Sequence, residues 1–291
     1  LTSGFQRSDL IILAARPGMG KTAFVMSLAR NAAVSFKKPV AIFSLEMSSL
    51  QLTTRLISSE AEIDAMRMRN GDLADHEWHQ LHVKIAKLSS APIFIDDTPA
   101  LNVFELRAKC RRLKSQHNIE MVIIDYLQLM AGNKDGRNSM NREQEISTIS
   151  RSLKGLAKEL NIPVIALSQL SREVEKRSGS GGKRPILSDL RESGSIEQDA
   201  DQVMFIYRPE YYGLHEDEEG RPTAGIAEII IAKNRHGALD TIALRFVSQY
   251  AKFANLDGFS VEEADSPGPT FKSITRASRM NEDETDDNVP F

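Results

Sequence analysis

The chain has little of what marks membrane-spanning or disulfide-bonded proteins. No run approaches the ~20 apolar residues that a bilayer-spanning helix needs, so we expect no membrane partner. The N-terminus, Leu1-Thr2-Ser3-Gly4, carries neither an initiator Met nor a basic-then-apolar signal, and we interpret it as the start of a fragment of a longer chain. The only cysteine, Cys110, cannot form an internal disulfide, which favours a reducing, cytoplasmic location.

Strong charge and aromatic side chains are also scarce. The 37 Lys and Arg residues are outnumbered by 40 Asp and Glu residues, giving a net charge of −3. A protein that coats nucleic acid over its whole surface would be basic, so any such contact must be local. Aromatic residues make up 6%, with one tryptophan (Trp78), which weakens the case for a base-stacking platform.

Short apolar runs alternate with amphipathic segments along most of the 291 residues. The expected strands are 9–14, 40–45, 93–95, 121–124, 164–167, 202–207, 226–232 and 241–246. The expected helices are 22–36, 51–59, 76–88, 103–117 and 142–160. This alternation predicts an α/β fold with a mostly parallel sheet flanked by helices. The last two runs follow each other without a helix, so they predict an antiparallel edge hairpin that turns near His236 and Gly237.

Polar, glycine-containing segments interrupt this pattern. Residues 132–139 and 176–185 are basic and lie between periodic segments, where we expect loops. From about residue 265 the apolar periodicity is lost, and 281–288 is an acidic run. We expect one domain over 1–264 and a disordered acidic tail over 265–291, with a partner-binding tail as the alternative.

A glycine-rich turn joins the first expected strand to the first expected helix. Strand, glycine-containing loop, Lys and Thr in this order are typical of a P-loop, in which backbone N–H groups cradle phosphates and the helix N-terminus adds positive partial charge. Ala15 stands where the first glycine of the motif is usual, and Gly18 can supply flexibility. We expect ATP to be held by Arg16, Pro17, Gly18, Met19, Gly20, Lys21, Thr22 and Ala23. Lys21 would reach the β- and γ-phosphates, and the Thr22 hydroxyl would ligate Mg²⁺.

Polar side chains follow three of the expected strands. Asp125 ends the apolar run 121–124 and can hold Mg²⁺ through water, although a turn aspartate is the alternative. Glu46 follows the run 40–45 and can polarise the attacking water, unless it is a surface capping carboxylate. Gln169 follows 164–167 and can sense the γ-phosphate by hydrogen bonding. Because the carboxyl ends of parallel strands share one sheet edge, all three would face the P-loop.

Together these segments resemble the RecA-like motor domain of replicative DNA helicases of the DnaB type. The segments that carry the resemblance are 15–22, 44–47, 123–130, 168–172, 188–201 and 233–237. The P-loop alone is shared by many enzymes, whereas the string 188–201 is far more specific, and the segments occur in the family's order. The resemblance covers about residues 1–261 and leaves out the family's N-terminal collar domain.

The resemblance implies a homo-hexameric ring that hydrolyses ATP with Mg²⁺, moves 5′–3′ on single-stranded DNA and separates duplex at the replication fork. It implies primase and a helicase loader as partners, in the cytoplasm at the bacterial nucleoid. Glu46 becomes the catalytic base, Lys21 and Gln169 act in catalysis, and Arg55 matches a nucleotide-contacting arginine of the family.

Lys233 and Arg235 match the family's pair that reaches into the neighbouring subunit's ATP site. An inserted guanidinium stabilises the charge on the γ-phosphoryl oxygens, by roughly 10³–10⁵ in rate. The two residues are two apart on an expected strand, so both side chains would point to one face. Ordinary surface charges on an edge strand are the alternative.

Arg191, Glu192 and Gly194 match the family positions that touch the DNA backbone. A glutamate suits such a position only if its backbone N–H does the binding, and amides presented this way fit a motor that ignores sequence. The basic loops 132–139 and 176–185 would assist, or are plain surface loops.

Two other classes of function compete with a helicase. A RecA-type recombinase or another RecA-fold hexameric ATPase shares the P-loop, but the string 188–201 argues against it. A non-hydrolytic nucleotide sensor or a structural ring subunit would not need Glu46, Gln169 and Arg235 in one chain.

Overall fold

Nine strands form one twisted sheet in the part of the chain that the structure describes. The computed structural model describes residues 2, 4–130, 142–177, 182–190, 194–217 and 219–256. All of them belong to one unit, Leu1–Gly258. The loop expected over 132–139 and the acidic tail expected over 265–291 lie outside these residues.

The strands run in the order β3-β2-β4-β5-β1-β6-β7-β8-β9. They are β1 (Leu10–Ala15), β2 (Val40–Ser44), β3 (Ile93–Asp96), β4 (Met121–Asp125), β5 (Val164–Gln169), β6 (Gln202–Tyr207), β7 (Ile226–Asn234), β8 (Asp240–Val247) and β9 (Lys252–Ala254). In this spatial order, the neighbours from β3 across to β6 (β3, β2, β4, β5, β1 and β6) pair in parallel. The neighbours from β6 to β9 pair antiparallel. The predicted α/β sheet with an antiparallel hairpin is therefore confirmed, and the short strand β9 extends the edge beyond that hairpin.

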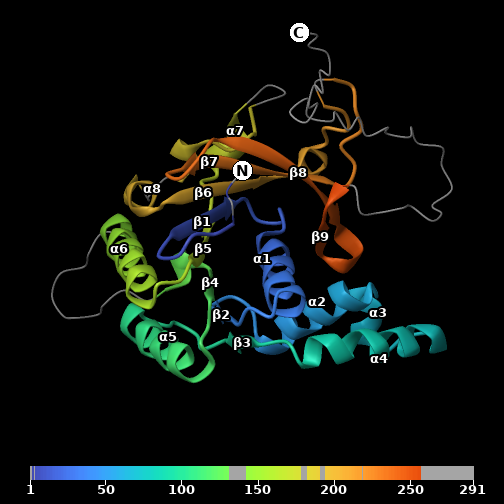
Figure 1. Ribbon diagram of the computed structural model, residues 1–291. Helices are drawn as coiled ribbons and strands as arrows, with labels where there is room; N and C mark the ends of the chain where they lie inside the picture. Colours follow the sequence, from blue (N-terminus) through green and yellow to red (C-terminus); the bar gives the residue numbers. More distant parts are fainter. Residues whose placement is uncertain are drawn as a thin grey trace, which may run out of the picture. The chain divides into compact units, whose positions relative to one another are not determined.

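Helices cover both faces of this sheet (Figure 1). They are α1 (Lys21–Arg30), α2 (Ser49–Ala61), α3 (Ala65–Asn70), α4 (Asp75–Ser89), α5 (Val103–His117), α6 (Arg142–Leu160), α7 (Glu173–Lys176) and α8 (Gly194–Asp199). The helix expected over 22–36 is α-helical only as far as Arg30, and a π-helical segment, Asn31–Ser35, continues it. None of the helices described is long and apolar enough to cross a membrane.

The two faces of β1 pack into two separate apolar cores. Leu10 and Ile12 belong to a cluster that includes residues of α5 and α6, whereas Ile11 and Leu13 belong to a cluster with α1 and α2. This division follows from the alternation of side chains along a strand, and it explains why every residue of β1 is apolar and buried. Cys110, on α5, is fully buried in the first cluster, and burial raises the pKa of its thiol to about 12.

The register of the strands divides the functional candidates between two opposite edges of the sheet, one at the carboxyl ends and one at the amino ends of its parallel strands. Ala15 pairs with Gln169, and Ser44 pairs with Asp125, so the carboxyl ends of β1, β2, β4 and β5 share one edge. The other edge is marked by Gln202, which starts β6 and pairs with both Ile11 and Asn234. Lys233 and Arg235 therefore lie at the edge opposite the P-loop.

Candidate nucleotide-binding site

The loop between β1 and α1 has the backbone geometry of a phosphate cradle. Gly18 and Gly20 have φ angles of +79° and +96°, which side chains rarely permit. Gly20 is the N-cap of α1 and provides no side-chain hydrogen bond, so no side chain caps the first turn of this helix. The N-terminus of α1 is thus open towards an anion.

Ala15 fits the position where the P-loop motif usually has glycine. It is the last residue of β1, is fully buried and has no positive φ angle. Its methyl group belongs to the apolar cluster shared with Ile11 and Leu13. Glycine's freedom is therefore not needed here, and the loop obtains its left-handed residues from Gly18 and Gly20.

Three residues expected at the nucleotide have side chains turned into the protein. The guanidinium of Arg16 donates to Glu175 Oε1 (2.9 Å) and to the carbonyl of Leu170 (2.8 Å). The side chains of Met19 and Ala23 are buried in the apolar cluster beside α1. Any contact of these three residues with phosphate must come from their main chains, and Arg16 instead ties the loop to the segment after β5.

Lys21 is half-buried and close to opposite charges. Its ammonium donates to the carbonyl of Ala15 (3.2 Å). Burial lowers the pKa of Lys21, the carboxylates of Asp125 and Glu46 oppose that shift, and Arg16 adds to it. A bound phosphate would supply the further negative charge that a desolvated ammonium favours.

Thr22 and Asp125 meet across the site. The Thr22 hydroxyl donates to Oδ2 of Asp125 (2.8 Å). Oδ1 of Asp125 is buried and has no hydrogen-bond partner among the described residues. Burial raises the pKa of Asp125, and the charge of Glu46 adds to that shift. A hydroxyl and an unpartnered carboxylate oxygen are the ligand types that Mg²⁺ takes, so these residues fit this ion.

Glu46 and Arg55 approach the same site from β2 and α2. Glu46 is exposed in the turn after β2, and its charge acts on Lys21 and Asp125. Arg55 is half-buried on α2, and its charge lowers the pKa of Asp125, against the stronger effect of burial. The structure thus brings both predicted residues to the P-loop edge.

The end of β5 is held by a residue that the sequence did not single out. The Gln128 side chain donates to Ser168 Oγ (2.8 Å) and accepts from the main-chain N–H of Gln169 (3.3 Å). Arg142 in turn donates to the carbonyl of Gln128 (2.5 Å). Gln128 therefore positions Gln169. Its place three residues after Asp125, within a segment that carries the resemblance, was the only available signal.

Three residues from later in the chain, Arg208, Tyr211 and Phe246, lie against the P-loop or hold a side chain that does. Arg208 donates to the carbonyl of Gly18 (3.3 Å), and its guanidinium lies 4.1 Å from the centre of the Phe246 ring. A Cβ atom added to Gly18 would lie 3.0 Å from the Tyr211 ring. Arg208 and Gly18 are 190 positions apart, so sequence patterns could not reveal this contact.

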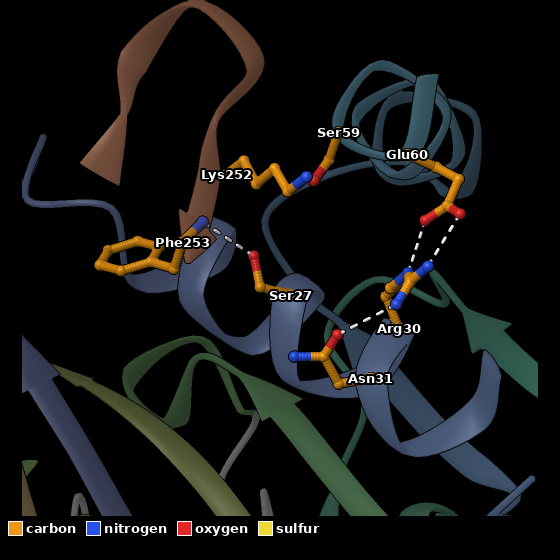
Figure 2. Close-up of a pocket in the computed structure, with 7 residues that line it drawn as sticks. All are labelled: Ser27, Arg30, Asn31, Ser59, Glu60, Lys252 and Phe253. Atoms are coloured by element: carbon orange, nitrogen blue, oxygen red, sulfur yellow. Dashed lines mark hydrogen bonds and ion pairs between the residues drawn. The ribbon is translucent and has the colours of Figure 1, made fainter. Parts of the chain in front are cut away.

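A small pocket of about 110 Å³ lies beside α1 (Figure 2). It is lined by Ser27, Arg30, Asn31, Ser59, Glu60, Lys252 and Phe253. Arg30 forms two hydrogen bonds to Glu60 (2.5 and 2.8 Å), which join α1 to α2. The volume is below the ~300–1,000 Å³ of typical small-molecule sites, so this pocket does not fit a nucleotide.

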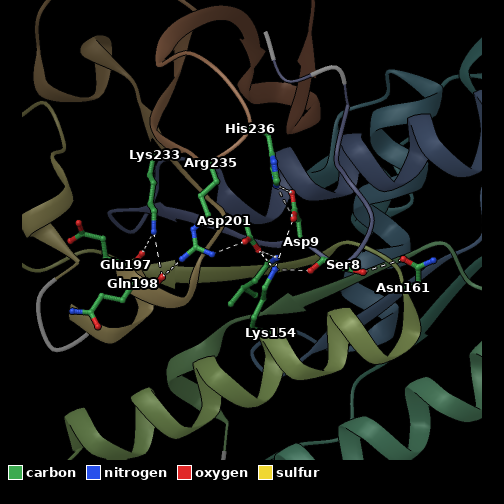
Figure 3. Close-up of polar contacts among 11 residues, drawn as sticks. Ser8, Asp9, Lys154, Asn161, Glu197, Gln198, Asp201, Lys233, Arg235 and His236 are labelled. Carbon is green, nitrogen blue, oxygen red and sulfur yellow. Dashed lines mark hydrogen bonds and ion pairs between the residues drawn. The ribbon is translucent and has the colours of Figure 1, made fainter.

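Lys233 and Arg235 lie side by side at the other edge of the sheet (Figure 3). Lys233 donates to the carbonyl of Glu197 (2.5 Å), and Arg235 donates to the carbonyl of Gln198 (2.7 Å). Both side chains therefore meet the same end of α8, although only Lys233 lies on β7 and Arg235 lies in the turn that follows, not on the strand as expected. Burial and the adjacent Arg235 lower the pKa of Lys233.

The residues expected at DNA are placed only in part. Arg191 and Glu192 lie outside the described residues, and Gly194 begins α8.

The basic segment 176–185 is described except for 178–181. Its cations are already engaged: Lys176 pairs with Glu173, Arg177 with Asp189, and Arg184 with Glu228, while Lys183 lies over Tyr212. Arg177 and Arg184 thus join the segment to other parts of the domain, whereas Lys176 pairs within α7 and its side chain stays exposed.

The fold and the site define a RecA-like P-loop nucleotide-binding domain. The family model of the DnaB-like helicase C terminal domain matches residues 1–255. The chain belongs to this family.

Relatives agree with this assignment. The replicative DNA helicase DnaB of Geobacillus stearothermophilus is 53% identical over 268 residues, which are 92% of this chain and 57% of that protein. The replicative DNA helicase DnaC of Bacillus subtilis (strain 168) is 52% identical over 257 residues, 88% of this chain and 54% of that protein. The chain spans somewhat more than half the length of these relatives.

Two solved structures are similar to most of the chain. A DnaB-like replicative helicase, studied for its interactions with primase, is 40% identical with a TM-score of 0.79, covering 87% of this chain and 59% of that one. The second structure is an isolated ATPase domain, which has the same identity and TM-score and covers 87% of both chains.

Proposed function

We propose that this chain is the ATP-hydrolysing motor of a replicative DNA helicase, with residues 1–264 as the motor domain and 265–291 as an acidic tail. The family and the P-loop site support nucleotide hydrolysis. The observation that carries the motor proposal is the division of the catalytic candidates between two sheet edges. Lys21, Thr22 and Asp125 lie at one edge, and Lys233 and Arg235 lie at the other.

Arg235 cannot complete the ATP site of its own protomer. It follows Asn234, which pairs with Gln202 at the level of Ile11. Ala15 lies four residues further along β1, about 13 Å away in that direction, and two strand spacings add about 10 Å across the sheet. The guanidinium of Arg235 is also turned towards α8. A useful role for Arg235 in hydrolysis therefore requires a second protomer, which supports a homo-hexameric ring with ATP at each interface.

Each residue has a distinct task in ATP hydrolysis. The main chain of the P-loop and Lys21 hold the phosphates. Thr22 and Asp125 would hold Mg²⁺, which when bound would neutralise charge on the phosphate oxygens. Glu46 orients the attacking water and accepts its proton, while Arg55 contacts the nucleotide. Gln169, held by Gln128, donates to the γ-phosphoryl group.

The neighbouring subunit supplies Lys233 and Arg235, which stabilise the negative charge that develops on the γ-phosphoryl group.

The motor would act on single-stranded DNA in the centre of the ring. Arg191, Glu192 and Gly194 contact its sugar–phosphate backbone, which allows movement without sequence preference. Movement 5′–3′ displaces the complementary strand at the fork. The relative studied with primase supports primase as a partner, and a helicase loader would place the ring on DNA in the bacterial cytoplasm, at the nucleoid.

Unwinding of a forked duplex by the assembled protein tests the proposal. We expect ATP-dependent strand displacement and an ATPase rate that rises with single-stranded DNA, and neither with Lys21→Ala. Strand exchange between homologous duplexes without fork unwinding would identify a recombinase instead. Nucleotide binding without hydrolysis would identify a sensor and contradict the motor.

A further inference from the structure

The carboxylate of Asp201 lies at the centre of the polar contacts around Arg235 (Figure 3). Its side chain is only 5% exposed. Oδ2 accepts hydrogen bonds from the main-chain N–H of Leu10 (2.8 Å) and from Lys154, while Oδ1 accepts from Arg235 (3.1 Å). Both oxygens are therefore held by hydrogen bonds. Oδ2 accepts from the first residue of β1, the strand that leads into the P-loop.

Asp201 stays ionised in this setting. Burial alone would raise the pKa of Asp201, but the hydrogen bonds from Lys154 and Leu10, together with the charges of Lys154 and Arg235, outweigh it and the pKa lies below its usual range. The carboxylate therefore carries a negative charge beside Arg235 at neutral pH.

Three bonds from Arg235 converge on this region. Its main-chain N–H donates to the carbonyl of Asp201 (2.9 Å), and its guanidinium donates to Asp201 Oδ1 and to the carbonyl of Gln198. Even so, its side chain is 47% exposed. A guanidinium has five N–H donors, so one edge can be held while another remains available to a phosphoryl group.

We propose that Asp201 is a positioning residue that orients the Arg235 guanidinium for the ATP site of the neighbouring protomer. This inference rests on the proposed role of Arg235 in trans. Main-chain carbonyls at the end of α8 hold the same two side chains. The carbonyl of Gln198 accepts from a second nitrogen of Arg235, and that of Glu197 accepts from Lys233. Holding the guanidinium in advance lowers the entropy lost when it meets the charge of the transition state.

Two other roles for this cluster explain less. Asp9, Asp201 and His236 lie close enough together to hold a metal ion. The cations Lys154 and Arg235 already balance the Asp201 carboxylate, however, which leaves little charge for an ion. A purely structural role, joining Leu10 to Lys154, would not need the contact between Oδ1 and Arg235.

The test is Asp201→Asn in the DNA-stimulated ATPase of the assembled protein. Asparagine keeps an acceptor for Leu10 but loses the charge that holds Arg235. We expect kcat to fall by roughly 10- to 100-fold while the KM for ATP changes little, because the P-loop is untouched. Asp9→Asn is the matched control: it removes a carboxylate of the same cluster that contacts His236 and Lys154 but not Arg235, and kcat should stay near wild type.

The double variant separates positioning from structure. If Asp201 acts through Arg235, Asp201→Asn should add no further loss of kcat in an Arg235→Ala background. Losses that multiply, or a kcat that Asp201→Asn leaves at the wild-type level while Arg235→Ala lowers it, would overturn the inference. A wild-type kcat in Arg235→Ala alone would instead overturn the proposed function of Arg235.

A second variant covers the case in which Asp201→Asn does not fold. Asp201→Glu keeps the charge beside Lys154 but moves the carboxylate by one methylene, so kcat should again fall only where Arg235 is present. An equal loss in the presence and absence of Arg235 would overturn the positioning role.

Discussion

The hydroxyl of Thr22 donates a hydrogen bond of 2.8 Å to Oδ2 of Asp125, which joins the first turn of α1 to the end of β4. The other oxygen of Asp125 is buried and has no partner in the described part of the chain. One carboxylate thus orders the hydroxyl that would ligate Mg²⁺ and keeps a second oxygen ready for the ion's water shell.

Asp125→Asn should weaken the use of Mg²⁺ without unfolding the site. The amide oxygen can still accept from Thr22, but the negative charge is lost. We expect half-maximal ATPase activity to need roughly 10- to 100-fold more Mg²⁺. Asp96→Asn is the matched control, since Asp96 also ends a strand of this sheet but pairs with Lys109 (2.6 Å). An unchanged Mg²⁺ titration in Asp125→Asn would exclude Asp125 from the metal site.

Glu46→Gln should separate nucleotide binding from hydrolysis. Glu46 is exposed at the P-loop edge and acts on Lys21 only through its charge, so its loss leaves the phosphate cradle intact. We expect kcat to fall by roughly 10²–10⁴-fold, with nucleotide affinity near wild type in an equilibrium binding assay. Lys21→Ala, which should lose binding itself, is the contrasting variant. Wild-type turnover in Glu46→Gln would mean that another group activates the water.

Gly20→Ala should disturb both the loop and its support. The φ angle of Gly20 is +96°, and an added Cβ atom would lie 3.2 Å from the ring of Phe253 and 3.3 Å from that of Phe246. We expect the free energy of unfolding to fall by about 1–2 kcal/mol in a denaturant titration, and nucleotide affinity to fall with it.

Gly155→Ala is the control for that substitution. Gly155 lies on α6, and an added Cβ atom would meet nothing within 4 Å, so we expect about 1 kcal/mol of stabilisation. A Gly20→Ala protein as stable as Gly155→Ala would contradict the loop geometry.

The sequence identified the regular elements well where local signals were strong. The helix predicted over 103–117 matches α5, because Asn102 and Glu105 form a capping box at its start. Strands β1, β2, β4, β5 and β6 were found because their apolar runs are buried on both faces. Strand β9, with three residues, and helix α8, with six, are too short to produce a periodic signal.

Side-chain partners were harder to predict than positions. The P-loop pattern placed Arg16 at the phosphates, yet its guanidinium binds Glu175, 159 residues away. The contact between Asp201 and the main chain of Leu10 spans 191 residues. Such contacts depend on the order of strands in the sheet, which no local pattern contains. Position at a strand end predicted that Glu46 and Asp125 lie beside the P-loop, which is where the structure places them. It gave no information on what holds Arg235.

The pair Arg30–Glu60 should make stability depend on acid pH. The hydrogen bonds from Arg30 lower the pKa of Glu60 below its ordinary 4.5, against the effect of burial. The unfolded chain therefore takes up a proton at a higher pH than the folded chain, and the stabilisation, complete above pH 4.5, is lost as the pH falls through the folded-state pKa.

Glu60→Gln should lower the free energy of unfolding by about 2 kcal/mol at pH 7, and the difference from wild type should close at acid pH. Glu120→Gln is the control, because Glu120 forms a more exposed pair with Lys38 (2.9 Å) and its loss should cost less than about 1 kcal/mol. A difference for Glu60→Gln that stays constant from pH 7 to well below pH 4.5 would contradict the assignment.

Mixed rings test most directly whether the ATP site is shared between protomers. Lys21→Ala subunits lack the lysine that binds phosphate but keep Arg235. Arg235→Ala subunits lack this arginine but keep Lys21. In an equimolar ring about a quarter of the interfaces would combine two intact halves. We predict that each variant alone retains only a small residual ATPase rate and that mixing restores part of the DNA-stimulated rate. No recovery in rings whose mixing is verified by mass would contradict a site that is completed by Arg235 of the neighbouring subunit.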